Sequence, residues 1–529
     1  MDSTAPKDAL STGALGLYDA TLFRAVDGRC PACAAPKQAL WYFEGDLVAV
    51  PRNATTWPAP DSGLPVADDI RQWLADGGPT YRRPPFLIWL GSPELIENAS
   101  LQLDGKTLQL ASGKTIPLSL IAKIPTNRSY YDNTSTLYLS KRQVRLRGQM
   151  QTAQDGGRKF VARVIWPEDY RVNAAALKLE PLASNETLGK LIEADNGGAE
   201  SPFSARLLWK RETSSSADLD HKAVLAFILN GAQGDDDEAH GGHFCVVTGW
   251  HRRDGAWADW MVNNFYNLDI YSEKGIIASM LPMDNYLTDL NSGQAYYRPS
   301  YLLAAVLRDS RAAELYQDAI QRVFDRFYRH EIEYDHAKAN CAGLSIDTLV
   351  GLGWQVPRLG PTSRARAALG YYYSAITDWS FASGRRAYRY LTEERSRLYP
   401  RAAFETLGTD LLSLVSSPNR PLTAYEQLLH DQVEAIVFVR IPQIPSSRAF
   451  GNYPVASYDE NMARVPKDRK DWKIIPVDPK PFPTQLLDRV PVRPAWSDTK
   501  VGLVAIGVPL LCAVVPISWW WMRRRRRTR

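Results

Sequence analysis

The sequence predicts an α+β fold that ends in a single membrane-spanning helix. Three observations carry this prediction: the first 200 residues contain short alternating apolar and polar runs, residues 201–360 combine further strands with a long helical pattern, and residues 501–522 form one apolar run. The chain has 529 residues, of which 45% are hydrophobic and 23% are charged. This composition is typical of folded proteins, and the length is sufficient for about three domains.

Charge and cysteine content exclude two classes of protein. The formal net charge is only +5, and Lys and Arg are spread along the chain instead of forming the dense basic stripe of a nucleic-acid binder. Five cysteines are too few for a disulfide framework. Cys30 and Cys33 form one Cys-x-x-Cys pair, and no second pair completes a tetrahedral zinc site. We therefore expect no nucleic-acid partner, and a small disulfide or inert thiols at this pair.

Residues 1–200 are predicted to form a β-rich N-terminal domain. Leucines at positions 101, 103, 108 and 110 surround Asp104-Gly105, which predicts a hairpin. Ser112-Gly113-Lys114-Thr115 ends like a phosphate-binding loop, but Leu108 stands where the earlier glycine is required, so a hairpin turn is predicted instead. Further strands are expected at residues 40–50, 86–90, 136–147 and 159–166.

The C-terminal part is predicted to be mainly helical over residues 361–450, followed by a proline-rich juxtamembrane stalk over 451–500. Residues 501–522 are long enough, at about 33 Å, to span a bilayer as a helix. Three tryptophans lie near the end of this segment at positions 519–521, five arginines follow at positions 523–527, and residues 523–529 form a basic tail. This pattern predicts a single-pass membrane protein with a cytoplasmic tail and an extracytoplasmic globular part, and makes the lipid bilayer a partner.

The first candidate site residues lie in a predicted hairpin. The segment that starts at His243 is rich in β-branched and aromatic residues, and Asp254-Gly255 is a turn signal. A turn at this position pairs residues whose numbers add up to about 507, which places His243 opposite Asn264. An amide that can orient the imidazole would therefore lie beside it.

The second candidate is a cysteine at the start of a predicted helix. A long amphipathic helix is expected over residues 310–332, and a second helix follows Asn340, which can act as its N-cap. Cys341 would then occupy the first helical position. There the helix dipole and the free backbone N–H groups should lower the pKa of the thiol and could bind an oxyanion.

This order of a histidine strand, a neighbouring strand with a polar residue, and an Asn-Cys dipeptide that opens a helix resembles the circularly permuted papain-like enzymes, relatives of NlpC-type peptidases and of lecithin retinol acyltransferase. The resemblance covers about residues 240–360 and implies a permuted papain-like domain over 201–360. It implies that Cys341 is the nucleophile, His243 the general base and Asn264 the residue that orients the imidazole. The acyltransferase group usually has a Glu-His-Phe-like stretch after its cysteine, whereas Ala-Gly-Leu stands here.

A Cys-His-Asn constellation favours a thiol hydrolase or acyltransferase that acts on an amide or ester bond in a peptide, a cell-wall peptide or a lipid, with no cofactor and no metal. Several alternatives stay open. Cys341 could be an ordinary buried helix residue. Cys245 shares a face with His243 in the predicted register and is a rival nucleophile without help from a helix dipole. The acidic, histidine-containing loop 234–243 could bind a metal ion, and the protein could be an inactive membrane-tethered scaffold.

Overall fold

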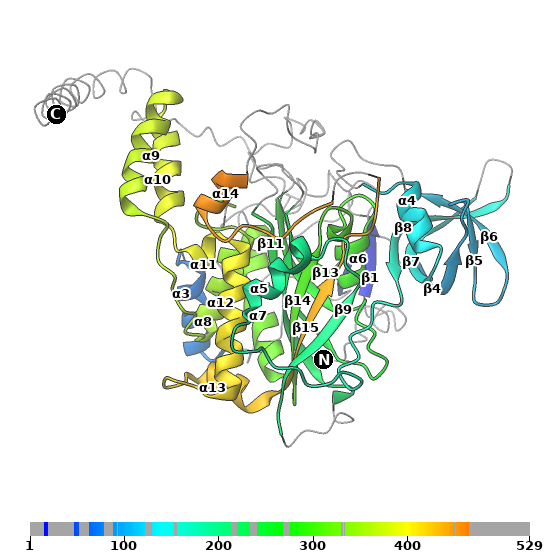
Figure 1. Ribbon diagram of the computed structural model, residues 1–529, viewed down its shortest axis with the longest axis horizontal. Coiled ribbons are helices and arrows are strands. Elements are labelled where there is room, and N and C mark those ends of the chain that lie inside the picture. The colour runs from blue at the N-terminus through cyan, green and yellow to red at the C-terminus, as the bar shows by residue number, and fades with distance from the viewer. Residues whose placement is uncertain are drawn as a thin grey trace, which may run out of the picture.

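The computed structural model describes residues 15–19, 47–51, 63–78, 88–91, 94–121, 130–152, 156–212, 219–232, 241–267, 276–328, 332, 334–447 and 450–464. These residues form an α+β structure with a ten-stranded sheet and a closed five-stranded barrel. Figure 1 shows the barrel at one end of the molecule and most helices at the other, with the large sheet between them.

The large sheet joins strands from distant parts of the chain. Its strands, in spatial order, are β1 (Leu15–Asp19), β2 (Leu47–Pro51), β3 (Ile88–Gly91), β13 (Ile276–Pro282), β12 (Met261–Asn267), β11 (His243–Trp250), β10 (Ala223–Asn230), β14 (Ser300–Leu307), β15 (Val433–Ile441) and β9 (Ser204–Lys210). Neighbouring strands are antiparallel except β3 and β13, which are parallel. Every residue of β10 and β14 is buried, because both faces of the sheet are covered there, and this explains the continuous apolar sequences of these strands.

Helices cover one face of the central strands. The helices α7 (Arg311–Tyr328), α8 (Cys341–Leu352) and α12 (Pro400–Ser416) all contact β10 or β11. Gln317 of α7 shows which face of the sheet this helix covers, because its side chain hydrogen-bonds to Thr248 of β11 and to Asn263 of β12. The remaining helices are α3 (Val66–Ala75), α4 (Asn133–Leu139), α5 (Leu188–Glu193), α6 (Met283–Thr288), α9 (Arg364–Thr377), α10 (Phe381–Thr392), α11 (Arg395–Leu398), α13 (Ala424–Gln432) and α14 (Tyr458–Arg464).

The barrel is bound to the body by buried ion pairs. Its strands, in order, are β4 (Glu94–Leu101), β5 (Thr107–Gln109), β6 (Thr115–Leu120), β8 (Arg158–Pro167) and β7 (Gln143–Thr152). Arg145 and Arg147 of β7 both pair with Asp284 of α6, at 3.0 and 2.8 Å. Arg163 of β8 pairs with Asp289, just after α6. Because these groups are nearly fully buried, loss of one partner would leave an uncompensated charge at the junction.

Most local elements predicted from the sequence are present. The hairpin at Asp104-Gly105 is the β4–β5 connection, and the predicted turn at Gly113 joins β5 to β6. The long helix expected over residues 310–332 is α7. The strand expected over residues 136–147 is wrong in its first half, because α4 occupies residues 133–139. Asp132 caps this helix by accepting hydrogen bonds from the first-turn N–H groups, which favours a helix over the extended conformation that the β-branched residues predict.

The prediction of a membrane-spanning helix requires correction. Among the residues that the structure describes, no helix is long and apolar enough to cross a membrane. The longest, α7, has 18 residues but carries charged side chains such as Glu314 and Arg322. The segments predicted as transmembrane helix (501–522), basic tail (523–529) and most of the stalk lie outside the described residues. The fold class that included this helix, and the single-pass membrane localisation with an extracytoplasmic body, are therefore not supported.

The expected divisions near residues 200, 360 and 450 stay predictions. The large sheet nevertheless takes strands from the first three predicted segments: β1 to β3 precede residue 200, β9 to β14 lie within 201–360, and β15 lies within 361–450. The ladder between β14 and β15 pairs eight residues of each strand. The predicted papain-like segment and the helical segment after it therefore share one hydrophobic core.

Candidate functional site

Strands β11 and β12 position the predicted histidine and asparagine, but in a shifted register. The observed pairs are Val246 with Asn263 and Val247 with Val262, so paired residue numbers add up to 509, and the predicted register is wrong by two residues. The physical reason lies in the connection. Residues 251–260 form a wide loop held by the buried side chains of Trp257 and Trp260 instead of a tight turn. A slip of two residues keeps the same side chains on the same face of the sheet.

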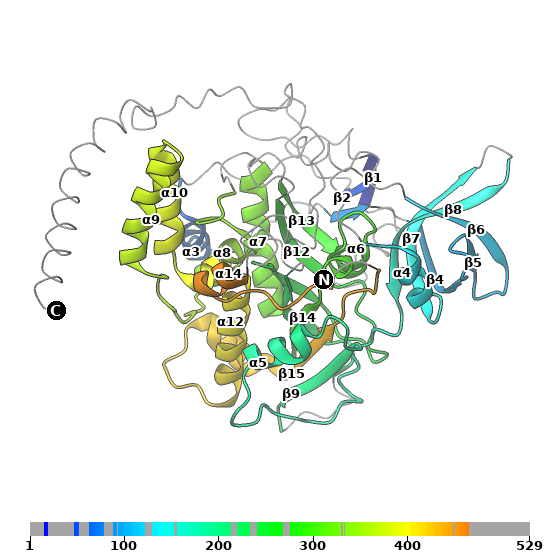
Figure 2. The same cartoon turned by 45° about the horizontal axis from the view of Figure 1, so that its top comes forward.

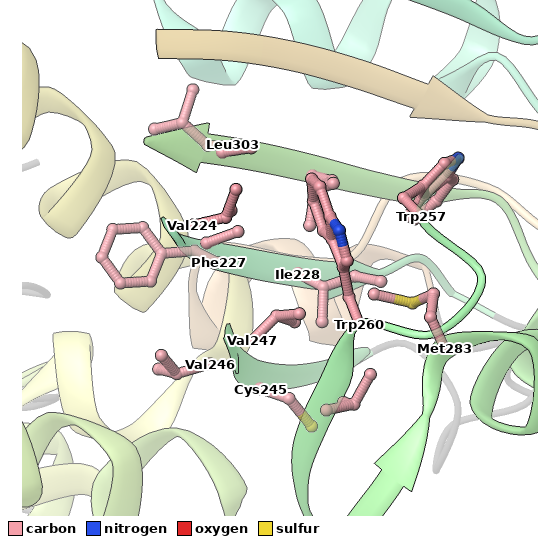
Figure 3. Close-up of a cluster of buried hydrophobic side chains, with 14 of the residues drawn as sticks. Val224, Phe227, Ile228, Cys245, Val246, Val247, Trp257, Trp260, Met283 and Leu303 are labelled. Atoms are coloured by element: carbon pink, nitrogen blue, oxygen red, sulfur yellow. The ribbon is translucent and has the colours of Figure 1, made fainter. Parts of the chain in front are cut away.

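His243, Asn264 and Cys245 therefore still meet. The Nε2 atom of His243 lies 2.8 Å from Oδ1 of Asn264 and 3.2 Å from Sγ of Cys245. The Cys245 sulfur also lies 3.5 Å from the Asn264 oxygen. All three side chains point to the face of the sheet opposite α7, since they alternate with Phe244 and Thr248 along β11 and with Asn263 along β12. Figure 3 shows Cys245 among the buried side chains of β10 and β11.

A series of side-chain hydrogen bonds from α6, β10 and β14 reaches this group at Cys245. The hydroxyl of Tyr286 in α6 lies 3.6 Å from the Cys245 sulfur and donates to Oδ1 of Asn230. The Asn230 amide in turn donates to the Ser300 hydroxyl at 2.8 Å. Because the Tyr286 proton is directed to Asn230, its oxygen can accept the Cys245 thiol proton. The Nε2 atom of His243 is then the protonated ring nitrogen and donates to Asn264, which leaves Nδ1 as the basic nitrogen.

Burial dominates the protonation equilibria of these groups. Burial, with the nearby positive charge of Arg298, lowers the pKa of His243 from 6.5 to about 4, although the hydrogen bond to Asn264 opposes this shift. Burial raises the pKa of Cys245 well above its usual value, and the charge of Cys341 raises it further. The pKa of Tyr286 is likewise raised well above its usual value by burial. In the resting site these groups are therefore neutral.

Cys341 occupies the position that the sequence predicts, at the start of α8. The Asn340 side chain is the N-cap and accepts a 2.7 Å hydrogen bond from the backbone N–H of Gly343. The same side chain donates to the carbonyl oxygens of His336 and Leu398, at 2.9 and 3.1 Å. These three bonds fix the start of the helix against two other segments of the chain.

The Cys341 thiol lies beside the strand that carries His243. It is close enough to the backbone N–H of Phe244 for this group to hydrogen-bond to the thiolate and lower its pKa, as do the N–H groups of Ala342 and Cys341 itself. On the β12 side of β11 the first paired residue is Val246, so the Phe244 N–H lies beyond the end of that ladder. Burial is nevertheless the largest influence and raises the pKa of Cys341. The predicted lowering of this pKa is therefore wrong, because packing outweighs the helix N-terminus.

Tyr334 is a site residue that sequence reasoning missed. Its hydroxyl interacts with both the backbone N–H and the side chain of Cys341, and burial raises the pKa of this hydroxyl well above its usual value. A tight loop brings it there: the Asp335 carboxylate accepts hydrogen bonds from the N–H groups of Ala337 and Lys338, at 2.8 and 3.1 Å. The only sequence signal was an aspartate in a short polar stretch before the Asn-Cys dipeptide, which is typical of a turn.

Arg298 is the cationic residue of the site. Its positive charge acts on His243, Cys245 and Cys341, lowering the pKa of each. Its guanidinium donates to the Gly231 carbonyl oxygen at 3.1 Å and to the Gln294 side-chain oxygen at 3.0 Å. The sequence provided no reason to single out this arginine, since it reaches the site from the end of β14 and through non-local packing.

Of the predicted site residues, the structure joins His243 directly to Asn264 and brings Cys341 to the same strand end. The thiol that contacts the His243 ring at 3.2 Å is the rival, Cys245. The two thiols differ in exposure, because Cys341 is 5% exposed whereas Cys245 is 0% exposed.

The Cys30–Cys33 pair and most of the acidic loop 234–243 lie outside the described residues. Within the described part, no group of three or more side chains of the types that bind metal is found.

The site is built by strand register, a helix cap and a returning loop. Comparisons of the chain with family models, with curated proteins and with solved structures find no match. The papain-like resemblance over residues 240–360 therefore stays a prediction that depends on the site residues alone.

Proposed function

We propose that this protein is a thiol-dependent acyl-transfer enzyme, a hydrolase or acyltransferase that acts on an amide or ester bond of a peptide or lipid substrate. In this proposal Cys341 is the nucleophile, His243 the general base and Asn264 the residue that orients the imidazole. The observation that carries the proposal is the environment of the Cys341 sulfur. It combines a capped helix N-terminus with the backbone N–H that directly follows His243.

Two arguments favour Cys341 over Cys245 as the nucleophile. The first is access, because Cys341 is 5% exposed and Cys245 is 0% exposed, although both thiols are buried. The second concerns the ring nitrogen. Cys245 contacts Nε2, the nitrogen held by Asn264, whereas a base oriented by an asparagine through one nitrogen acts through the other. We therefore assign Cys245 a positioning role beneath the imidazole.

The chemistry then follows from the donors around the sulfur. The His243 side chain leaves β11 on the face opposite α7, so in this step its imidazole turns around the strand end and takes the proton of the Cys341 thiol as the sulfur attacks the substrate carbonyl carbon. The backbone N–H of Ala342, with the Tyr334 hydroxyl, stabilises the oxyanion. The imidazolium returns the proton to the departing amine or alcohol, which leaves a thioester. Water or a second acceptor then attacks this thioester and releases the thiol.

The neutral resting site makes this mechanism depend on substrate. A thiol whose pKa is raised and an imidazole whose pKa is lowered to about 4 do not form a stable ion pair in the free protein. The proton therefore moves only when a developing oxyanion is present to stabilise the charge. We expect alkylation of Cys341 by iodoacetamide to require a pH above the ordinary thiol value of about 8.5, whereas a pre-formed ion pair would react in neutral solution.

The proposal is tested with an electrophilic acyl probe on the full chain, followed by peptide mass spectrometry to locate the labelled cysteine. We expect labelling at Cys341, loss of this label in Cys341→Ser, and persistence in Cys245→Ala. His243→Ala should slow labelling by about 100-fold, because a general base contributes at least this factor. The matched control is His221→Ala, which removes an imidazole whose side chain is 88% exposed and should label at the parental rate.

Two results would refute the assignment. Labelling of Cys245 in place of Cys341 would reverse the roles of the two thiols. Equal labelling rates for the parent, His243→Ala and His221→Ala would show that the imidazole does not activate either sulfur.

A further inference from the structure

Helices α9 and α10 form a hairpin that projects from the rest of the molecule. Figures 1 and 2 both show the two helices side by side, standing beyond the helices that cover the sheet. They pack on each other through a small separate core of Ala375 and Phe381 with Tyr371. A close approach of the helices at Gly384, where a Cβ atom would lie 2.7 Å from the Tyr371 carbonyl oxygen, fixes their relative position.

The outward face of α9 is apolar. Leu369, Tyr372, Tyr373 and Ile376 follow the i, i+3, i+4, i+7 spacing of one helix face, and they are 72%, 48%, 72% and 55% exposed. A surface helix normally directs such a stripe to the core and polar residues to solvent. Here the inner face, with Tyr371 and Ala375, is apolar as well. A continuous exposed apolar stripe of this kind marks an interaction surface.

Trp379 extends this stripe into the connection between the helices. It is 51% exposed and has a φ of +50°, a left-handed conformation that costs a bulky residue about 1 kcal/mol or more relative to glycine. Neither burial nor backbone preference explains a tryptophan at this position. We therefore interpret the exposed indole ring as the reason why a tryptophan stands here.

The charge of the hairpin is strongly positive. The segment from Arg364 to Thr392 contains five arginines and a single carboxylate, Asp378, which lies in the connection. Arg386 and Arg389 of α10 are exposed. The chain as a whole is much more evenly balanced, with 63 basic and 58 acidic residues. The hairpin is therefore a local concentration of basic and aromatic groups.

We propose that the α9–α10 hairpin binds the surface of an anionic lipid bilayer, lying on it without crossing it. An α9 of 14 residues, about 21 Å long, is too short to span the hydrocarbon core. Its apolar face would enter the headgroup region, where tyrosine and tryptophan are the favoured side chains, and the exposed Arg386 and Arg389 would pair with anionic headgroups. A second copy of this chain fits less well, because two hairpins of the same positive charge repel each other.

The test is sedimentation of the full-length protein with vesicles of phosphatidylcholine alone or with about one third phosphatidylglycerol, a composition that creates a negative surface potential. We expect binding to the anionic vesicles that weakens as salt is added. The double variant Leu369→Ser/Tyr373→Ser should bind at least about tenfold more weakly, because it removes two inserted side chains. Arg386→Gln/Arg389→Gln should also weaken binding about tenfold or more. The apolar run at residues 501–522 is the same in every variant, so differences report on the hairpin.

Trp379→Gly and Leu103→Ser make the test specific. Glycine favours the backbone conformation at position 379, so Trp379→Gly should retain or raise the thermal stability while it weakens vesicle binding. Leu103 lies in the barrel and is 72% exposed, the same fraction as Leu369, so Leu103→Ser should bind as the parent does. The proposal is overturned if the parent does not prefer anionic vesicles or if the stripe variants bind like the parent. It is also overturned if these variants only abolish self-association of the protein.

Discussion

Acidification should destabilise the protein through the buried imidazole of His243. In the folded chain its pKa is about 4, against 6.5 when it is solvated, so between these values the unfolded chain binds a proton that the folded chain does not. Stability therefore falls as the pH is lowered through this window and is unaffected by this group above it. The full effect, below about pH 4, is about 3 kcal/mol, and at about pH 5 it is about 2 kcal/mol.

The measurement is guanidinium unfolding followed by tryptophan fluorescence at about pH 7.5 and pH 5, on the parent and on His243→Gln. Glutamine can still donate to Asn264 but does not titrate. All other titrating groups are common to both proteins, among them the buried His251, whose pKa burial also lowers. We expect the parent to lose about 2 kcal/mol more than the variant between the two pH values. His221→Gln, at the exposed histidine, should behave as the parent does.

An equal loss in the parent and in His243→Gln would refute the reasoning. It would mean that the imidazole is either solvated in the folded protein or already charged there. A charged imidazole would also remove the argument for a neutral resting site, because its natural counter-ion in that position is a thiolate.

Three further substitutions test how the site and its surroundings are held. Asn340→Ala should lower the free energy of unfolding by about 1 kcal/mol because the N-cap is lost, whereas Asn340→Ser keeps an uncharged capping oxygen and should lose less; equal losses would contradict the cap. Arg147→Met should cost about 2 kcal/mol in urea unfolding, because it removes a partner of the fully buried Asp284, and an unchanged midpoint would contradict the ion-pair junction. Gly408→Ala should lower the melting temperature, because its Cβ atom would lie 2.4 Å from a side-chain carbon of Leu188; a raised melting temperature would show that the helices can move apart.

Local elements could be predicted because their signals are local. The hairpin at Asp104-Gly105, the amphipathic pattern of α7 and the N-cap at Asn340 depend on a few neighbouring residues, and each is present. The arrangement of the large sheet could not be predicted in this way. It pairs β3 with β13 and β14 with β15, across nearly 200 and more than 100 residues, and no periodicity along the chain identifies such partners.

The candidate site was partly predictable for a specific reason. Strand alternation restricts errors of register to even numbers of residues wherever one face must be buried. The predicted pairing was therefore wrong by two residues, yet His243 and Asn264 still share a face and meet at 2.8 Å. Tyr334 and Arg298 could not be found, because each reaches the site through a loop or strand end whose path depends on tertiary packing.

The wrong prediction for the Cys341 pKa shows where local rules fail. A helix N-terminus supplies donors within one turn, and these donors are present and act in the predicted direction. Burial against β11 depends on the whole fold and acts in the opposite direction more strongly. The same burial lowers the pKa of His243. Both shifts therefore disfavour a thiolate–imidazolium ion pair in the free protein. In such a site the helix terminus and the imidazole do not stabilise a thiolate in the free protein. They lower the energy of a charge that appears during the reaction, which is when acyl transfer requires it.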